Sequence, residues 1–338
     1  MSLISTKLTK LLGIQVPIIL PPMAKVDHPE LLNVLTRSGA FGFMGAGYMT
    51  APTLSKHLQR IRQVMGIGSS LPLPIGIGYI CWQLEQSTAE VTPDPCITAG
   101  LKEGVRAVWL AFGEHIGRYV KQVRSVSPKT YIFVLVNSVE EAVRATYEYK
   151  ADVLVVQGRE AGGHGAADAL PLSQIFVAVR RAIPLDGPIL VAAGGITTGA
   201  HTASMLTLGA DGVVMGTRFL MTPESGYSDM KKDILLKAGL NASTKSTAFD
   251  ESISSPWPKT ITGRGITNGI IRDAEGGLSL DERVANARKD AEEGKMDRTI
   301  VWTGTGSGLI TELNPATDVL QEIKEDTIRA LKNASSLL

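Results

Sequence analysis

Residues 153–165 read Val153-Leu154-Val155-Val156-Gln157-Gly158-Arg159-Glu160-Ala161-Gly162-Gly163-His164-Gly165, an apolar run followed by a glycine-rich turn that ends on a histidine. The apolar run predicts a strand that is buried on both faces, as the strands of parallel sheets are. Glycines let a backbone approach a ligand closely, and an imidazole exchanges protons near neutral pH. This stretch therefore indicates an active-site loop at the end of a parallel strand.

Comparable apolar runs recur along the first two-thirds of the chain, and most are followed by a helical pattern of apolar residues. The predicted strands are 16–20, 41–44, 74–80, 107–112, 131–136, 153–157, 189–193 and 212–215. Eight alternations at a spacing of roughly 28 residues fit a closed (β/α)₈ TIM barrel, an α/β fold. The second option is an open doubly wound sheet, but its Gly-x-Gly-x-x-Gly turn after the first strand is missing.

The pattern changes after Met221, where prolines and glycines become frequent and no further strand–helix repeat is found. We predict helices over 230–238 and 280–293, and a last barrel helix over 320–331. Residues 222–300 are therefore expected to form a subdomain inserted after strand 8, in a chain whose segments 1–221 and 301–338 make the barrel. We expect the inserted subdomain to form one wall of the substrate cavity.

The composition excludes several classes of protein. Of the 338 residues, 34 are Lys or Arg and 33 are Asp or Glu, which gives no support for binding nucleic acid or an anionic membrane. No apolar run reaches about 18 residues, so no membrane span is expected. Two cysteines, Cys81 and Cys96, are too few for a disulfide framework and fit reduced thiols in a cytoplasmic protein. A homodimer is one option for the oligomeric state.

Two glycine-containing turns, Gly194-Gly195 and Gly216-Thr217, follow the seventh and eighth predicted strands. Backbone N–H groups at helix starts attract anions, and a threonine hydroxyl adds another donor. The loops after strands seven and eight are also the usual phosphate site of such barrels. We therefore predict a bound phosphate group there; the alternative is that these glycines only relieve tight turns.

His164 is the strongest catalytic candidate, because it follows a glycine pair at a strand end and can accept a proton from carbon. Arg159 and Glu160 share its turn, and they either orient the imidazole or form a surface ion pair. Solvated or capping roles are expected for the other four histidines, which are His28, His57, His115 and His201. No pair of histidines has metal-ligand spacing, so no protein-bound metal is expected.

A turn of Pro21-Pro22-Met23 closes the first predicted strand. Because Pro22 has no N–H, the turn can offer carbonyl groups and the Met23 amide to a flat ligand. Many such turns are purely structural, so this one indicates a ligand site only when it is considered together with the other loops.

Together these loops resemble the nitronate monooxygenase family, formerly called 2-nitropropane dioxygenases. The matching stretches are Pro17 to Ala24, Gln157 to Gly165, Ala192 to Ile196, Val214 to Phe219, Gly263-Arg264 with Asn268, and Trp302 to Ile310. The resemblance covers nearly the whole chain and implies an FMN cofactor. It implies phosphate contacts from Gly194, Gly195, Gly216 and Thr217, and contacts to the ring and ribityl chain from Pro22, Met23, Gln157 and Gly162. Gly163 and Met215 lie in the same matching stretches and are predicted to bind the cofactor as well.

The resemblance also implies an activity, in which His164 is the base and O₂ oxidises a nitronate or nitroalkane to a carbonyl compound and nitrite. One position departs from the family, since many members carry Asn where this chain has Gly78, and this puts the substrate in question. A related alternative is a flavin enoyl-thioester reductase that uses NAD(P)H. A further alternative is a barrel without flavin that binds a phosphorylated metabolite.

Overall fold

The computed structural model describes residues 4–24, 26, 28–87 and 93–337. Eight parallel strands close into a barrel, and the strand order β1-β2-β3-β4-β5-β6-β8-β9 is completed where Ile18 of β1 pairs with Val213 of β9. The strands are β1 (Ile18–Leu20), β2 (Phe41–Gly45), β3 (Leu73–Ile80), β4 (Val105–Ala111), β5 (Tyr131–Val136), β6 (Val153–Gln157), β8 (Ile189–Ala193) and β9 (Gly212–Val214). The predicted (β/α)₈ barrel is confirmed.

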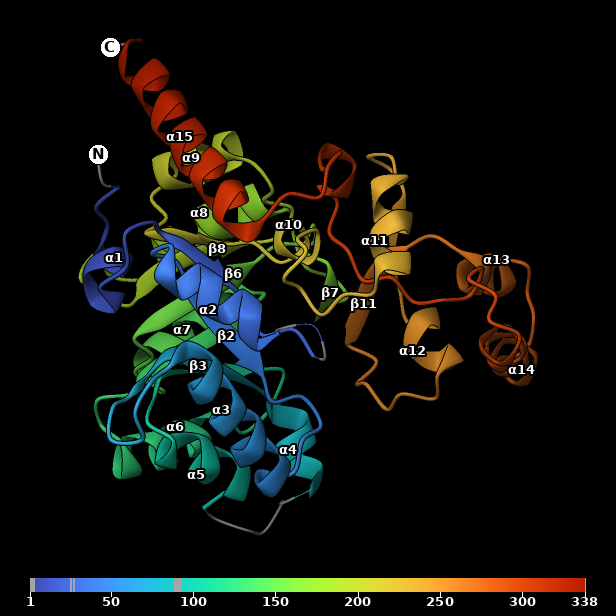
Figure 1. The fold of residues 1–338 in the computed structure, drawn as a ribbon, viewed down its shortest axis with the longest axis horizontal. Helices are drawn as coiled ribbons and strands as arrows, with labels where there is room; N and C mark the ends of the chain where they lie inside the picture. The colour runs from blue at the N-terminus through green and yellow to red at the C-terminus, as the bar shows by residue number, and fades with distance from the viewer. Residues whose placement is uncertain (1–3, 25, 27, 88–92, 338) are drawn as a thin grey trace.

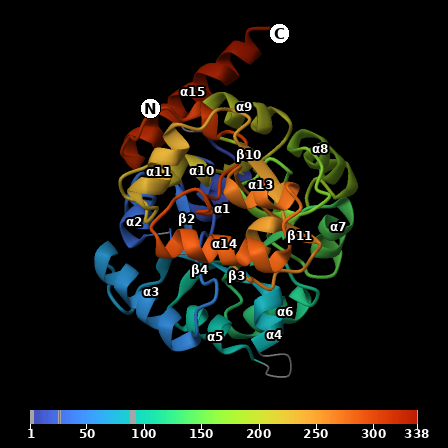
Figure 2. The same ribbon diagram turned by 90° about the vertical axis from the view of Figure 1, so that its right-hand side faces the viewer.

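A ring of helices surrounds the barrel (Figure 2). Its members are α2 (Pro29–Arg37), α3 (Ala51–Met65), α5 (Pro95–Lys102), α6 (Ile116–Val126), α7 (Val139–Tyr147), α8 (Leu172–Ala182), α9 (Gly199–Thr207) and α15 (Ala316–Ser335), with the short helices α4 (Cys81–Ser87) and α10 (Thr217–Leu220) at strand ends. The last helix, α15, packs against α9 and α2 (Figure 1). This contact needs a glycine, because a Cβ on Gly199 would lie 2.5 Å from the backbone nitrogen of Thr327.

Neighbouring residues of a strand point to opposite sides of the barrel wall and fill two separate cores. Ile19 belongs to the interior core, whereas Ile18 and Leu20 belong to the core between strands and helices. The interior holds packed aromatic rings, and the Phe43 ring lies 5.0 Å from that of Phe133. A Cβ on Gly76 would lie 2.2 Å from the Phe43 ring, so this strand glycine makes room for it. Helix α1 (Lys7–Leu12) adds its apolar side chains to this interior core.

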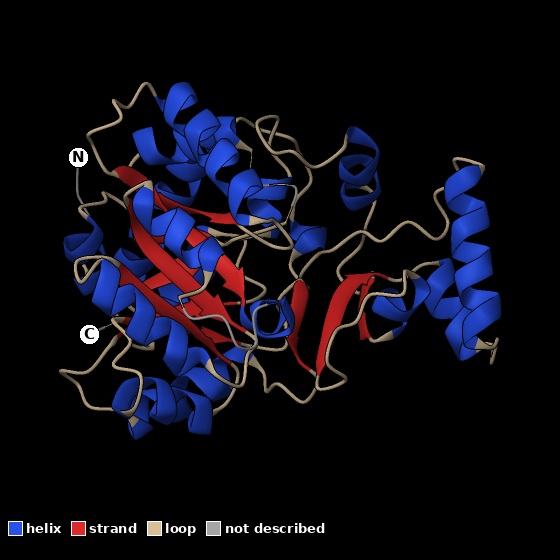
Figure 3. Cartoon of the chain, turned by 90° about the horizontal axis from the view of Figure 1, so that it is seen from below, coloured by secondary structure: helices blue, strands red, loops and turns tan. Residues whose placement is uncertain are grey.

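A second, antiparallel sheet lies beyond the carboxyl ends of the barrel strands (Figure 3). Its strand order is β10-β11-β7, formed by β7 (Gly163–Ala166), β10 (Ser243–Ser246) and β11 (Ile261–Ile266). The sequence places residues 163–166 in a loop; they form a strand because β11 pairs with them, His164 opposite Gly263. The predicted glycine–histidine loop is therefore partly an edge strand.

The remaining elements of the segment 222–300 pack around this sheet (Figure 1). They are α11 (Asp229–Leu236), α12 (Ala248–Ser252), α13 (Gly269–Glu275) and α14 (Leu280–Glu292), followed by the 3₁₀ turn η1 (Ser307–Leu309). Helix α14 begins at a capping box in which Ser279 and Glu282 each satisfy the other's backbone N–H. The two helices predicted for this segment correspond to α11 and α14, and the sequence missed α12 and α13. Among the described residues, every helix is too short or too polar to cross a lipid bilayer.

Candidate active site

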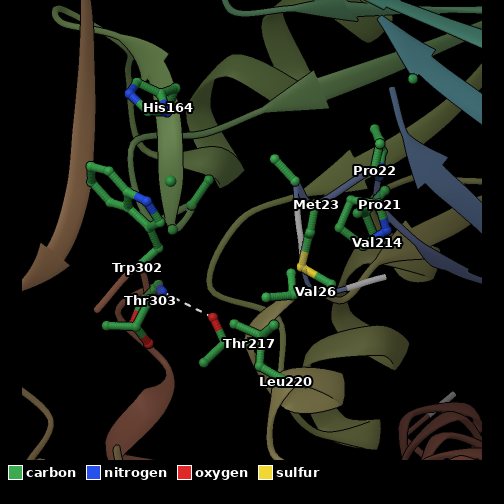
Figure 4. A pocket seen from close by; sticks show the side chains of 18 of the residues that line it. Pro21, Pro22, Met23, Val26, His164, Val214, Thr217, Leu220, Trp302 and Thr303 are labelled. Atoms are coloured by element: carbon green, nitrogen blue, oxygen red, sulfur yellow. Dashed lines mark hydrogen bonds between the residues drawn. The ribbon is translucent and has the colours of Figure 1, made fainter. Parts of the chain in front are cut away.

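A cavity of about 790 Å³ opens at the carboxyl ends of the barrel strands, between the barrel and the second sheet. Its volume is in the range of about 300–1,000 Å³ that is usual for small-molecule and cofactor sites. Figure 4 shows Pro21, Pro22 and Met23 on one side of it and His164 and Trp302 on the other. The site is thus where a (β/α)₈ barrel carries its chemistry.

The predicted site residues come together in this cavity, with one exception. Those that line it are Pro22, Met23, Gln157, Gly162, Gly163, His164, Gly194, Gly195, Gly216 and Thr217. The exception is Met215, whose side chain is fully buried in the core between strands and helices. Its backbone N–H donates to the carbonyl of Ile19 at 3.0 Å, so neither group faces the cavity.

The turns after β8 and β9 offer free hydrogen-bond donors. The N–H groups of Gly194, Gly195, Gly216 and Thr217 donate no hydrogen bond within the described part of the chain. Gly194 has φ 116° and Gly195 has φ 70°, conformations that L side chains rarely adopt. Consecutive unpaired N–H groups on a strained glycine turn form a concave site for an anion. The unpaired N–H groups favour the prediction that these turns bind a phosphate group over the alternative that their glycines only relieve tight turns.

The sequence placed Trp302 to Ile310 among the stretches that match the family but assigned no site residue to this loop, which follows α14. Gly304 donates its N–H to the hydroxyl oxygen of Thr217 at 3.0 Å, and Thr305 donates to the carbonyl of Glu160 at 3.0 Å. A Cβ on Gly162 would lie 2.4 Å from the Gly304 nitrogen, so the two loops touch along their backbones. The repeated glycines at 304, 306 and 308 were the available signal for this close approach.

Gly78 faces the Pro22 ring. A Cβ at position 78 would lie 2.3 Å from two carbons of that ring, so any side chain there would displace the proline. The Pro22 ring therefore leaves no room for a side chain at position 78 in this chain. The two residues form one packing unit beneath the cavity.

Gln157 anchors β7 to the barrel. Its side-chain nitrogen donates to the carbonyl of His164 at 3.2 Å, and its side-chain oxygen accepts from Asn137 at 2.9 Å. Behind β7, Lys245 donates to the carbonyl of Ala166. Burial and the neighbouring guanidinium groups of Arg264 and Arg159 lower the pKa of Lys245 to about 8. These contacts fix the strand that carries the catalytic candidate.

The His164 ring is held by three side chains that sequence reasoning missed. Its Nε2 lies 3.0 and 3.1 Å from the two carboxylate oxygens of Asp250, whose side chain is only 7% exposed. The Trp257 ring stacks on it, with centroids 3.7 Å apart and planes within 9°. Trp302 lies at 5.0 Å, packed over Gly263. Asp250 and Trp257 stand in no recognisable motif, and Trp302 begins a stretch that matches the family but was given no role at the site.

The outer wall of the cavity comes from the segment 222–300. Tyr227, Ile253 and Trp257 line the cavity from this side. Tyr48, from the barrel loop after β2, is hydrogen-bonded to Ser255 and Trp257, and burial raises the pKa of its hydroxyl. The wall is thus tied to the barrel rim by a tyrosine.

The other predictions about titratable groups concern residues away from the His164 ring. Glu160 accepts the N–H of Leu172 at 2.9 and 3.0 Å and so caps α8 rather than contacting His164. His201 accepts the N–H of Thr197 at 3.3 Å, and burial lowers its pKa. Within the described residues, no three His, Cys, Asp or Glu side chains are grouped as metal ligands would be.

Several known proteins are similar to this chain over nearly its full length. Nitronate monooxygenase npaC of Metarhizium robertsii is 33% identical over 344 aligned residues, which cover 93% of this chain and 91% of the relative. A nitronate monooxygenase of Neurospora crassa is 27% identical, covering 93% and 90%. Among solved structures, nitroalkane oxidase from Streptomyces ansochromogenes has a TM-score of 0.76 at 25% identity, covering 97% and 99%. FabK from Thermotoga maritima has a TM-score of 0.79 at 24% identity, covering 99% and 100%.

The barrel, the cavity and these relatives define the class of flavin-dependent oxidoreductases built on a (β/α)₈ fold. More narrowly, a model of the nitronate monooxygenase family matches residues 5–326, and the chain belongs to that family. The resemblance seen in the sequence is confirmed.

Proposed function

We propose that this enzyme binds FMN and uses O₂ to oxidise nitronates and nitroalkanes to a carbonyl compound and nitrite, with His164 as the base. The observation that carries the proposal is the imidazole of His164 in the same cavity as the unpaired N–H groups of the two glycine turns. Family membership supports the reaction class.

The residues present fit FMN. The N–H groups of Gly194, Gly195, Gly216 and Thr217 would hold its phosphate, because they are unpaired donors at the usual phosphate position of a barrel. Pro22, Met23, Gln157, Gly162 and Gly163 would lie along the ring and ribityl chain. The cofactor, when bound, supplies the electron transfer between substrate and O₂.

The chain's own contribution is to bind the substrate and move a proton. His164 takes the proton from the carbon that bears the nitro group, and Tyr227, Ile253 and Trp257 of the segment 222–300 line the cavity on the same side. We accordingly interpret 222–300 as a substrate-cavity subdomain on a barrel made by 1–221 and 301–338. Residues 1–3, 25, 27, 88–92 and 338 of those segments lie outside the described residues.

The test is direct. Purified protein should be yellow, should release FMN on denaturation, and should release nitrite from ethyl nitronate under air. Replacing His164 with Ala should retain the flavin and lower kcat/KM for neutral nitroethane by about 100-fold or more, as loss of a general base does. Undiminished turnover of nitroethane would reject the base role.

The same preparation separates the alternatives. Oxidation of NAD(P)H with a crotonyl thioester, without nitrite release, would indicate the enoyl-thioester reductase; the likeness to FabK is one of fold. A colourless protein that takes up no flavin would indicate a barrel that binds another phosphorylated metabolite.

A further inference from the structure

Asp250 is the only carboxylate that hydrogen-bonds the His164 ring within the described residues. It lies on α12, in the segment 222–300, and both of its oxygens are within 3.1 Å of Nε2. The residue is 5% exposed, so its carboxylate is shielded from water. Its helix contacts β11, the strand in which Gly263 is paired with His164.

The contact determines which ring nitrogen carries the proton. An ionised carboxylate only accepts hydrogen bonds, so Nε2 must be the N–H of the neutral imidazole and Nδ1 must hold the lone pair. Nδ1 has no hydrogen-bond partner among the described residues. The Trp257 ring, stacked at 3.7 Å, prevents the imidazole from tilting out of this arrangement.

We propose that Asp250 is a positioning residue that keeps His164 ready to take a proton at Nδ1, so that its contribution is confined to neutral nitroalkanes and is absent for nitronates. The proposal rests on the proposed function. In the step concerned, the C–H bond beside the nitro group breaks and an N–H bond forms at Nδ1. The electron pair left on carbon moves onto the nitro group and gives the nitronate, while the carboxylate of Asp250 pairs with the imidazolium. A nitronate supplied as such needs no proton removed.

The experiment compares two forms of one substrate on the FMN-loaded enzyme. Asp250→Asn should lower kcat/KM for nitroethane by about 10- to 100-fold, within the usual contribution of general-base catalysis, and change it less than about threefold for ethyl nitronate. The kinetic isotope effect with nitroethane deuterated at the reacting carbon should rise in the variant, because C–H cleavage becomes more rate-limiting.

The matched control is Glu251→Gln. It removes the next carboxylate of the same helix, which pairs with Arg283 at 2.7 Å rather than with His164. It should leave the ratio of the two activities unchanged. An equal loss on both substrates in Asp250→Asn, or no loss on nitroethane, would overturn the proposal. Wild-type protein that releases nitrite from neither substrate would instead reject the proposed function, and this inference with it.

A second measurement does not depend on the variant's folding. Nitrogen-15 NMR of histidine-labelled wild-type enzyme, with the His164 signal assigned by its loss in His164→Ala, reports the tautomer. The neutral ring should carry its proton on Nε2. A proton on Nδ1 would contradict the proposal whatever the kinetics of Asp250→Asn.

Discussion

The glycines in the turns after β8 and β9 differ in what a side chain at their position would disturb. Gly195 has φ 70°, and an added Cβ would lie 2.9 Å from the Cβ of Glu160, so the backbone itself requires glycine there. Gly216 has φ −92°, and an added Cβ would make only ordinary contacts, 3.4 Å from Pro21 and 3.5 Å from Met23. Position 216 is therefore free for a side chain as far as the fold is concerned, and the space beside it is part of the cavity.

This difference predicts the behaviour of two variants. Gly216→Val should keep the thermal stability of the cofactor-free protein but weaken FMN binding about tenfold, which corresponds to about 1.4 kcal/mol. Gly195→Ala should destabilise the cofactor-free protein by about 1–2 kcal/mol, because alanine is strained at positive φ. Melting curves and FMN titrations measure both. Unchanged FMN affinity in Gly216→Val would contradict the phosphate assignment.

A single residue could be predicted as a site residue where a reactive side chain stands next to a recognisable local pattern. His164 stands next to a glycine pair at a strand end, so its sequence neighbours alone indicate its environment. Asp250 is 86 residues away from it, on a helix of five residues with no recognisable pattern. Trp257 is equally undistinguished in the sequence, and Trp302 was noted only as the start of a stretch that matches the family. Their association with His164 depends on non-local pairing, which a local pattern does not contain.

At the scale of elements, one arginine joins the helices that cover the second sheet. Arg298 contacts Asp273 of α13 through two nitrogens, at 2.7 and 2.9 Å, and Asp290 of α14 at 2.9 Å. Asp290 is 6% exposed, so its charge depends on this partner. The guanidinium of Arg298 also lowers the pKa of Asp273 below its ordinary value of 3.8.

Replacing Arg298 with Met should therefore lower the free energy of unfolding by about 2–4 kcal/mol at pH 7, since Asp273 and Asp290 lose their cationic partner and Asp273 keeps only the hydrogen bond from Asn286 among the described residues. Because the pKa of Asp273 is lower in the folded protein than in the unfolded chain, its ionised carboxylate stabilises the fold at pH values above the ordinary pKa. This stabilisation is lost as the pH falls through the folded-state pKa. The difference in free energy of unfolding between the wild type and Arg298→Met should therefore become smaller at low pH. Denaturant titrations at pH 7 and pH 3 measure this.

A matched variant is Arg272→Met, which removes the exposed pair with Asp297. It should cost less than about 1 kcal/mol, as exposed ion pairs do. Equal losses in the two variants would show that the buried cluster is no more important than a surface pair.

Elements were predictable when their own sequence carries the signal. The barrel strands are continuous apolar runs because both of their faces are buried, and β6 and β8 were located to the residue. Strand β7 consists of Gly163-His164-Gly165-Ala166 and β10 of Ser243-Thr244-Lys245-Ser246, and neither has an apolar face. These strands exist because β11 lies between them, a property of the fold rather than of either stretch.

At the scale of the whole molecule, the cavity is lined by residues from the barrel, from the second sheet and from the segment 222–300. The turns after β8 and β9 supply the unpaired N–H groups, strand β7 of the second sheet supplies His164, and the segment 222–300 supplies Asp250 and Trp257. None of these parts alone encloses the site. A ligand that spans from the glycine turns into the cavity should therefore stabilise the folded molecule as a unit, by an amount set by its affinity.

Comparing FMN with riboflavin, which lacks the phosphate, tests this at the level of the intact protein. FMN at 100 times its Kd should stabilise the fold by about 2.7 kcal/mol. With about 2.1 cal/mol/K of unfolding entropy per residue, this raises the Tm by about 4 °C in a chain of this length. Riboflavin at the same concentration should give a clearly smaller shift, because the N–H groups of Gly194, Gly195, Gly216 and Thr217 gain no partner. In Gly216→Val the two shifts should converge; equal shifts in the wild-type protein would instead mean that the phosphate is bound elsewhere or left in solvent.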